Sequence, residues 1–197
     1  MGIQLTNWMG QHADMMDEIS PQSTIRPAAH RDSNTVVKLW KRLVTEIDVA
    51  AGYPDLHAAV DKWSDRLGRQ IDEEKAFVAE LDGKIVGFAC YVGRTAGSGL
   101  QNRRTDRLKG PGLPIPLGVA YVTDLYVTPA ARHQGLAQGL LGVIMRGAES
   151  TGFHTVWTNT SSRNKRTLSL LSKLGFAPLQ GFQIPDLDNQ VYYARAL

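Results

Sequence analysis

The sequence lacks the features that mark several classes of protein. Cys90 is the only cysteine, which excludes an intrachain disulfide and a cysteine-rich zinc or redox framework, and favours a reducing compartment. No apolar stretch approaches the length that crosses a bilayer. Residues 1–20 carry Asp14, Asp17 and Glu18 where a secretory signal needs an apolar run. We therefore expect a cytoplasmic protein with no membrane partner.

Strong charge of one sign is also absent. The formal net charge is +3 over 197 residues, which is too small a surplus to indicate a nucleic-acid-binding protein. Hydrophobic residues make up 43% of the chain and charged residues 21%, as in a folded globular protein. The length favours one core, so we expect a lead-in over residues 1–22 and a single domain over residues 23–197.

Hydrophobic periodicity predicts alternating strands and helices. A short strand ends at Pro27, and apolar residues at helical spacing then predict two helices, the second ended by Gly68. Asp82-Gly83 is a two-residue hairpin turn between strands over 75–81 and 84–92. The later segments add a strand over 119–127, a helix from Gly135 to Gly152, a strand over 154–158, a helix over 164–174, and strands over 176–182 and 190–196.

The most informative segment follows the strand over 119–127. A helix is expected to start near Gly135, and the start of a helix exposes backbone N–H groups and a partial positive charge. The small residues Gly135 and Ala137 let a diphosphate approach these donors, and Arg132 adds a positive charge. The segment is neither a Walker loop nor a dinucleotide fingerprint, because the required spacings are absent. It therefore predicts an anion-binding turn.

Together with its flanks, this segment resembles the acetyl-CoA signature of the GCN5-related N-acetyltransferase (GNAT) superfamily. The resemblance rests on Leu125-Tyr126-Val127, Pro129, Arg132-x-x-Gly135-x-Ala137 and Leu140-Leu141, followed by Asn164-x-x-Thr167-x-x-Leu170-Leu171-x-Lys173-Leu174-Gly175-Phe176. It covers roughly residues 24–197 and implies the GNAT fold, an α/β (α+β) fold with a central mixed twisted sheet of six to seven strands and about four flanking helices. It also implies an N-acetyltransferase that uses acetyl-CoA as cosubstrate. His12, His30, His57 and His154 show no metal-ligand spacing, so no metal is expected.

The resemblance assigns roles to individual residues. The backbone of Leu125, Tyr126 and Val127 is expected along the pantetheine arm. The diphosphate is expected on Arg132, His133, Gln134, Gly135, Leu136, Ala137 and Gln138. Asn164 contacts the pantetheine or acetyl region in the family, with capping of its helix as the alternative. His133 either touches phosphate or faces solvent, and Gly135 is alternatively a simple turn glycine.

Acetyl transfer to an amine requires an unprotonated amine, a polarised thioester carbonyl and a stabilised thiolate. Asp124 is the candidate base, and a structural or acceptor-positioning aspartate is the alternative. Relatives with a Glu-Asp pair on this strand have glutamate where this chain has Thr123. Many relatives protonate the thiolate with a tyrosine at the position of Leu171, so Tyr126 or Tyr121 is left as the substitute, unless the thiolate leaves without a donor.

The sequence indicates the acetyl acceptor less clearly than it indicates the cofactor. A small-molecule amine is the main expectation, with a protein lysine or N-terminus, or a CoA-binding sensor without chemistry, as alternatives. Five basic residues against one acid in residues 93–118 favour an acidic acceptor, unless this segment is a solvated loop. A polyamine or aminoglycoside acceptor would instead suit an acidic groove, which Asp48, Asp55, Asp61 and Asp65 could supply. A homodimer is compatible with the resemblance, but no interface is specified.

Overall fold

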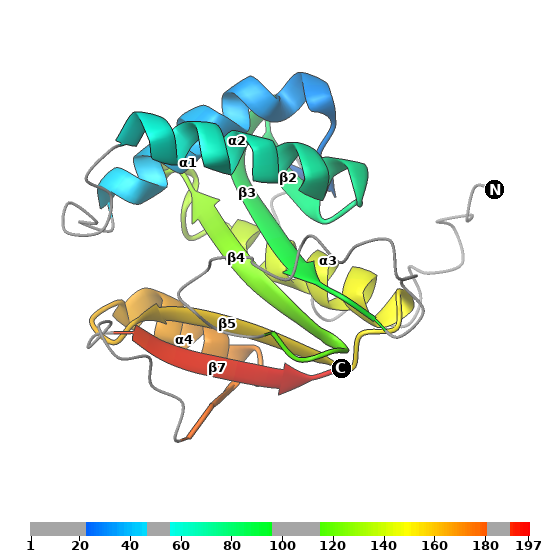
Figure 1. The fold of residues 1–197 in the computed structure, drawn as a ribbon. Helices are drawn as coiled ribbons and strands as arrows, with labels where there is room; N and C mark the ends of the chain where they lie inside the picture. Colours follow the sequence, from blue (N-terminus) through cyan, green and yellow to red (C-terminus); the bar gives the residue numbers. More distant parts are fainter. Residues whose placement is uncertain (1–22, 47–55, 96–114, 181–189) are drawn as a thin grey trace.

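A computed structural model describes residues 23–46, 56–95, 115–180 and 190–197, which form a mixed sheet with helices on both faces (Figure 1). The strand order is β1-β2-β3-β4-β5-β7-β6, and only β4 and β5 run parallel. The seven strands and four α-helices of the described ranges agree with the expected architecture. The elements are β1 (Ser23–Pro27), α1 (Ser33–Glu46), α2 (Leu56–Asp72), β2 (Ala76–Leu81), β3 (Lys84–Gly93), β4 (Val119–Val127), α3 (Leu136–Ser150), β5 (Thr155–Ser161), α4 (Lys165–Lys173), β6 (Ala177–Pro178) and β7 (Gln190–Ala196).

Alternating side chains of the central strands enter two separate cores. In β2, Ala76 and Val78 belong to the core under α1 and α2, whereas Phe77 and Ala79 belong to the core under α3 and α4. This two-sided burial explains why β2 is almost wholly apolar. The hairpin between β2 and β3 turns at Asp82 and Gly83, both with positive φ, as the Asp-Gly pair predicts.

Three of the element boundaries expected from the sequence are wrong. α2 continues past Gly68 to Asp72. Burial of Leu67, Gln70 and Ile71 stabilises these turns of the helix by more than the roughly 1 kcal/mol that one glycine costs inside a helix. β5 extends to Ser161, since β7 pairs along its whole length. β6 holds only two residues, and it lies at the sheet edge, where a proline is tolerated although it has no N–H group to donate. Residues 181–182 of that predicted strand lie outside the described residues.

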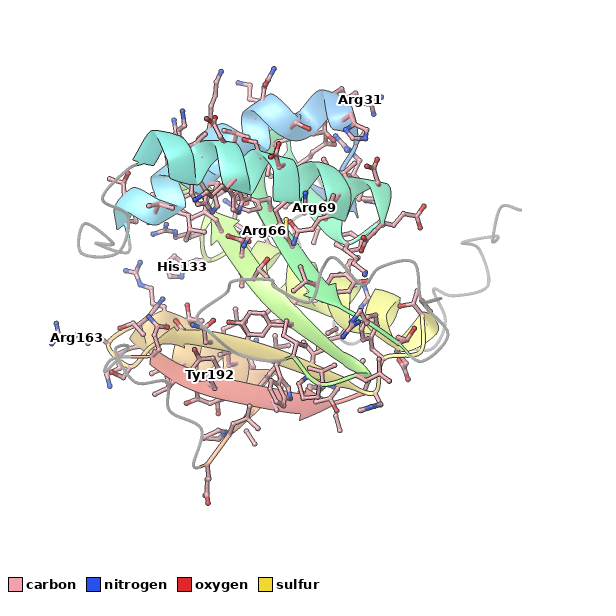
Figure 2. All side chains as sticks on the ribbon, in the orientation of Figure 1. Arg31, Arg66, Arg69, His133, Arg163 and Tyr192 are labelled. Carbon is pink, nitrogen blue, oxygen red and sulfur yellow. The ribbon has the colours of Figure 1, made fainter. Side chains whose placement is uncertain are left out.

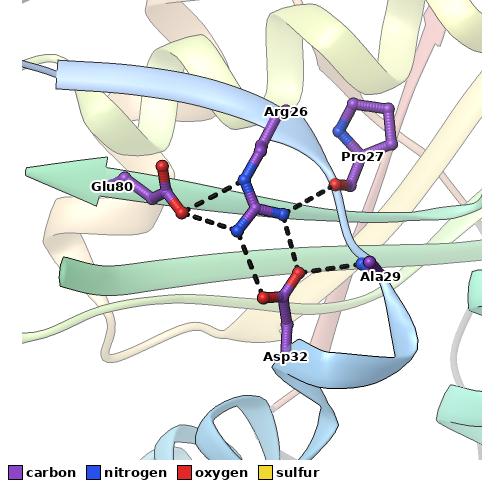
Figure 3. Close-up of polar contacts among 5 residues, drawn as sticks. All are labelled: Arg26, Pro27, Ala29, Asp32 and Glu80. Carbon is purple, nitrogen blue, oxygen red and sulfur yellow. Dashed lines mark hydrogen bonds and ion pairs between the residues drawn. The ribbon is translucent and has the colours of Figure 1, made fainter. Parts of the chain in front are cut away.

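Arg26 connects β1 to β2 and to the segment before α1 by hydrogen bonds (Figure 3). The guanidinium of Arg26 on β1 donates to Asp32, just before α1, and to Glu80 on β2, with shortest distances of 2.6 Å to each. Asp32 also accepts a hydrogen bond from the backbone N–H of Ala29 at 2.8 Å. The hydrogen bond from Arg26 is the main reason that the pKa of Asp32 lies below its usual value. The cluster fixes where α1 begins relative to the sheet.

Candidate active site

β4 and β5 separate halfway along β4. Their pairing joins Val119–Val122 to Thr155–Thr158 and then stops, while β4 stays paired with β3 up to Val127. Figure 1 shows the two strands together at one end and apart at the other. From Thr123 to Val127, one edge of β4 therefore has no partner strand within the described residues. Such an edge offers backbone N–H and C=O groups to an extended ligand.

A bulge in β4 determines which side chains face the helices. Cys90 pairs with Asp124 and Tyr91 pairs with Val122, which leaves Thr123 as an extra residue on β4. Because side chains alternate along a strand, the extra residue brings Asp124 and Tyr126 to the side of α1 and α2. Without the bulge, the alternation would turn both residues to the opposite face.

Asp124 is buried beneath α1 and α2 and binds three donors. Its Oδ1 atom accepts hydrogen bonds from the indole N–H groups of Trp40 at 3.0 Å and Trp63 at 3.2 Å. Its Oδ2 atom accepts a hydrogen bond from Arg66 at 2.8 Å, which makes an ion pair. Figure 2 shows Arg66 between α2 and β4. Among the described residues, these three donors leave one lone pair of Oδ2 for another donor.

Arg66 is a residue of this site that was not predicted from the sequence. Trp63, Arg66 and Gln70 follow one another at intervals of one helical turn on α2. The charged Arg66 and the amide Gln70 therefore lie on the same face of the helix as the apolar Trp63. Gln70 is 3% exposed, and its Nε2 atom donates to Tyr91 O at 3.2 Å and to Thr123 Oγ1 at 3.3 Å. A polar residue on a buried helix face was the available signal for both residues.

A second cluster joins β4, the turn before α3 and the end of α1. The Tyr126 hydroxyl donates to Glu46 at 2.6 Å, and Arg132 donates to Glu46 at 2.5 Å. Arg132 also donates through Nε to Val127 O at 2.9 Å. Burial, together with the hydrogen bond to Glu46, raises the pKa of Tyr126 to about 12. Tyr126 is therefore protonated at neutral pH, and Glu46 is a site residue that the sequence did not reveal.

The turn before α3 presents the expected row of backbone donors. Within the described residues, no backbone N–H group from His133 to Gln138 donates a hydrogen bond, and the next, Gly139, donates to Gly135 O at 2.8 Å. Gly135 caps the helix with φ at 73°, a conformation that suits glycine. His133 is exposed (Figure 2). These residues fit a diphosphate, because an anion can approach several N–H groups at a helix start that has no capping side chain.

Three further residues have defined positions. Asn164 caps α4, since its Oδ1 atom accepts a hydrogen bond from Thr167 N at 3.2 Å. Leu171 is 1% exposed within the core under α3 and α4. The Tyr121 hydroxyl donates to Asn159 on β5, beside the point where β4 and β5 separate. Burial raises the pKa of Tyr121 above its usual value, so this tyrosine also keeps its proton.

Other chemistry has little support in the described parts of the chain. Cys90 is fully buried, and burial raises the pKa of its thiol well above the usual value, so it is a poor nucleophile. Among the described residues, no group of three or more His, Cys, Asp or Glu side chains could hold a metal ion. In the same ranges, no helix has the length and apolar character needed to span a membrane.

Comparisons with known proteins agree with the observed fold. Residues 40–176 match the family model described as the acetyltransferase (GNAT) family. No curated protein has a significant match to the chain. Among solved structures, yncA, a putative acetyltransferase from Salmonella typhimurium solved with acetyl-CoA, has a TM-score of 0.64 and 20% identity over 89% of this chain and 94% of that chain.

Two other solved structures have similar folds. The ribosomal-protein-alanine N-acetyltransferase from Brucella melitensis has a TM-score of 0.63 and 18% identity over 88% of this chain and 99% of that chain. The paia N-acetyltransferase from Thermoplasma acidophilum, solved with coenzyme A, has a TM-score of 0.59 and 15% identity over 89% of this chain and 99% of that chain. At these identities the similarity establishes the fold.

Proposed function

This chain belongs to the acetyltransferase (GNAT) family, and we propose that it transfers the acetyl group of acetyl-CoA directly to the amine of a small molecule. The reaction breaks the thioester C–S bond and forms an amide C–N bond, while the amine loses a proton and the thiolate gains one. The observation that carries the proposal is that, among the described residues, backbone groups of β4 and of the following turn are free to bind a ligand. Residues 123–127 lack a β5 partner, and residues 133–138 have N–H groups without partners in the described chain.

These two stretches of backbone supply the cofactor site in the proposal. The free edge of β4 at Leu125, Tyr126 and Val127 holds the pantetheine arm by main-chain hydrogen bonds, and the N–H groups from His133 to Gln138 hold the diphosphate. Arg132 adds a guanidinium beside them. The same β4 edge has N–H groups that stabilise a developing oxyanion. Asn164 lies at the start of α4, and contact with the pantetheine region is its proposed second role beside the cap.

Asp124 holds the acceptor amine in this proposal. Its carboxylate accepts hydrogen bonds from Arg66 and two indole N–H groups, and among the described residues Oδ2 retains a lone pair that can accept a hydrogen bond from an ammonium group. The same lone pair supports the alternative role of base. Tyr126 is the candidate proton donor to the thiolate: its hydroxyl is protonated at neutral pH, and it must leave its hydrogen bond to Glu46 to donate that proton. Both roles are tested by the pH dependence of turnover.

A protein acceptor is the second candidate. One of the similar folds is a ribosomal-protein-alanine N-acetyltransferase, which acts on a protein. Both candidates use the same cofactor site and differ only in what reaches Asp124.

Release of free thiol from acetyl-CoA tests the proposal directly. The purified chain is assayed with a panel of small amines and with peptides that present a lysine or a free N-terminus. Turnover with a small amine supports the main proposal, and faster turnover with a peptide supports the second candidate. CoA binding without turnover on any acceptor would contradict both and would leave a CoA-binding sensor. The absence of CoA binding would overturn the cofactor site itself.

A further inference from the structure

Glu46 contacts two residues of the proposed cofactor site at once. It is the last residue of α1, and it lies 80 and 86 positions along the chain from its two partners. Oε1 accepts the hydrogen bond from the Tyr126 hydroxyl at 2.6 Å, and Oε2 accepts the hydrogen bond from Arg132 at 2.5 Å. One carboxylate therefore links α1 both to β4 and to the turn before α3.

Among the described residues, the contacts of Arg132 leave part of its guanidinium uncommitted. Nε donates to Val127 O at 2.9 Å, one terminal nitrogen donates to Glu46, and the guanidinium carbon lies 5.7 Å from the centroid of the Tyr126 ring. These contacts use two of the five N–H donors that a guanidinium carries. The Arg132 side chain is 28% exposed, so donors can face a ligand while the group is held in one orientation.

Glu46 is ionised in this arrangement. Partial burial opposes the charge, but the hydrogen bonds from Tyr126 and Arg132 outweigh it, and the pKa of Glu46 lies below its usual value. A charged carboxylate strengthens both hydrogen bonds. It also removes rotational freedom from Arg132 before any ligand arrives, and prior ordering of a side chain improves affinity.

We propose that Glu46 is a positioning residue for acetyl-CoA: through Arg132 it orients a guanidinium for the diphosphate, and through Tyr126 it fixes the same turn to β4. The inference rests on the proposed function, because it requires a diphosphate beside Arg132. It adds a contribution from α1, the helix that also contacts Asp124 through Trp40. Glu46 could also have the opposite role. If its carboxylate competed with the diphosphate for Arg132, it would weaken the binding of CoA.

The two roles predict opposite effects on affinity, which titration calorimetry with CoA measures. We expect Glu46→Ala to raise the dissociation constant of CoA by about three- to tenfold, the range for losing a partly exposed charged hydrogen bond. Glu46→Gln keeps an oxygen acceptor and is expected to have an intermediate value. Glu149→Gln removes one charge from an exposed position in the last turn of α3 and is expected to bind CoA like the wild type.

A double-mutant cycle separates positioning from a general structural role. In the Arg132→Ala background, Glu46→Ala is expected to change the dissociation constant by less than about twofold, because the group that Glu46 orients is gone. Urea unfolding of each variant, measured in parallel, shows whether the chain is folded. Full additivity of the two substitutions, or no effect of Glu46→Ala on CoA binding, would overturn the inference.

Tighter CoA binding by Glu46→Ala would also overturn it and would identify Glu46 as a competitor for Arg132. Failure of the proposed function gives a different result, since the wild type itself would then not bind CoA. If Glu46→Ala unfolds, Glu46→Gln replaces it in the same cycle. Wild-type CoA affinity of Glu46→Gln alone, or full additivity of Glu46→Gln with Arg132→Ala, would then contradict the positioning role.

Discussion

Trp40 on α1 and Trp63 on α2 stack on each other and donate to the same oxygen atom of Asp124. Their ring centroids are 4.9 Å apart with an interplanar angle of 19°, and their indole nitrogens lie 3.0 Å and 3.2 Å from Oδ1. Trp63 also packs edge-on against Phe88 of β3, with centroids 5.8 Å apart. Two consecutive helices are thus joined to β4 through one buried carboxylate.

Replacing either tryptophan by phenylalanine keeps an aromatic ring and removes the indole donor. Each single variant is expected to lose about 1 kcal/mol of unfolding free energy, since the other indole still satisfies Oδ1. Trp40→Phe/Trp63→Phe is expected to lose more than the sum, because Oδ1 is then a buried acceptor without a partner. Urea unfolding of the four proteins measures the coupling. Simple additivity would show that the two indoles stabilise Asp124 independently.

Asp124→Asn removes the charge that pairs with Arg66 while keeping the size of the side chain. Breaking a buried ion pair on one side leaves the other charge unpaired, and because Arg66 is partly exposed we expect a loss of about 2–3 kcal/mol in urea unfolding. Asp61 is the matched control, since it lies on the exposed surface of α2. Asp61→Asn is expected to unfold like the wild type.

The same variant distinguishes the two roles of Asp124 in turnover. If Asp124 holds the acceptor ammonium, Asp124→Asn raises the KM of the acceptor by about tenfold, as for a lost charged hydrogen bond, and leaves the pH dependence of kcat in place. If Asp124 is the base, kcat falls by about a hundredfold or more and its acid limb disappears. Unchanged kinetics would remove Asp124 from both roles.

Gly135 and Gly83 offer a matched pair of substitutions. Both have φ near +70°, at 73° and 71°, and Gly83 lies in the hairpin between β2 and β3. Gly135→Ala and Gly83→Ala are each expected to lose about 1–2 kcal/mol of stability, because a Cβ is strained in this conformation. Only Gly135→Ala is expected to weaken CoA binding, since a Cβ there crowds the approach to the helix start. Equal CoA affinity of the two variants, measured by calorimetry, would contradict the diphosphate site.

Tyr126→Phe should change how stability depends on alkaline pH. The folded protein holds the Tyr126 proton up to a pKa of about 12, whereas an unfolded chain releases it near the ordinary value of 10. The stabilisation is complete below pH 10 and is lost as the pH rises from 10 to 12. Between pH 9 and 11 the wild type is expected to lose about 1 kcal/mol more than Tyr126→Phe in urea unfolding. The other buried tyrosines are present in both proteins, so parallel losses would contradict the raised pKa.

The elements nearest the proposed cofactor site could be predicted because local rules govern them. The bounds of β4 and the start of α3 follow from a strand pattern, a proline and a glycine turn, all within about a dozen residues. Gly68 shows the opposite case. A glycine that normally ends a helix stays inside α2, because burial of residues beyond it decides the helix length.

The sequence by itself determined the order of the elements and the glycine turn before α3, since each depends on residue types at short, fixed spacing, and its motifs indicated the fold class through their resemblance to a family. Only the tertiary structure decided the partners of Asp124, which come from Trp40, Trp63 and Arg66, between 58 and 84 positions away. It likewise placed Glu46 against Arg132. Such contacts depend on how two helices pack on the sheet and on one extra residue in β4, and no local pattern encodes either.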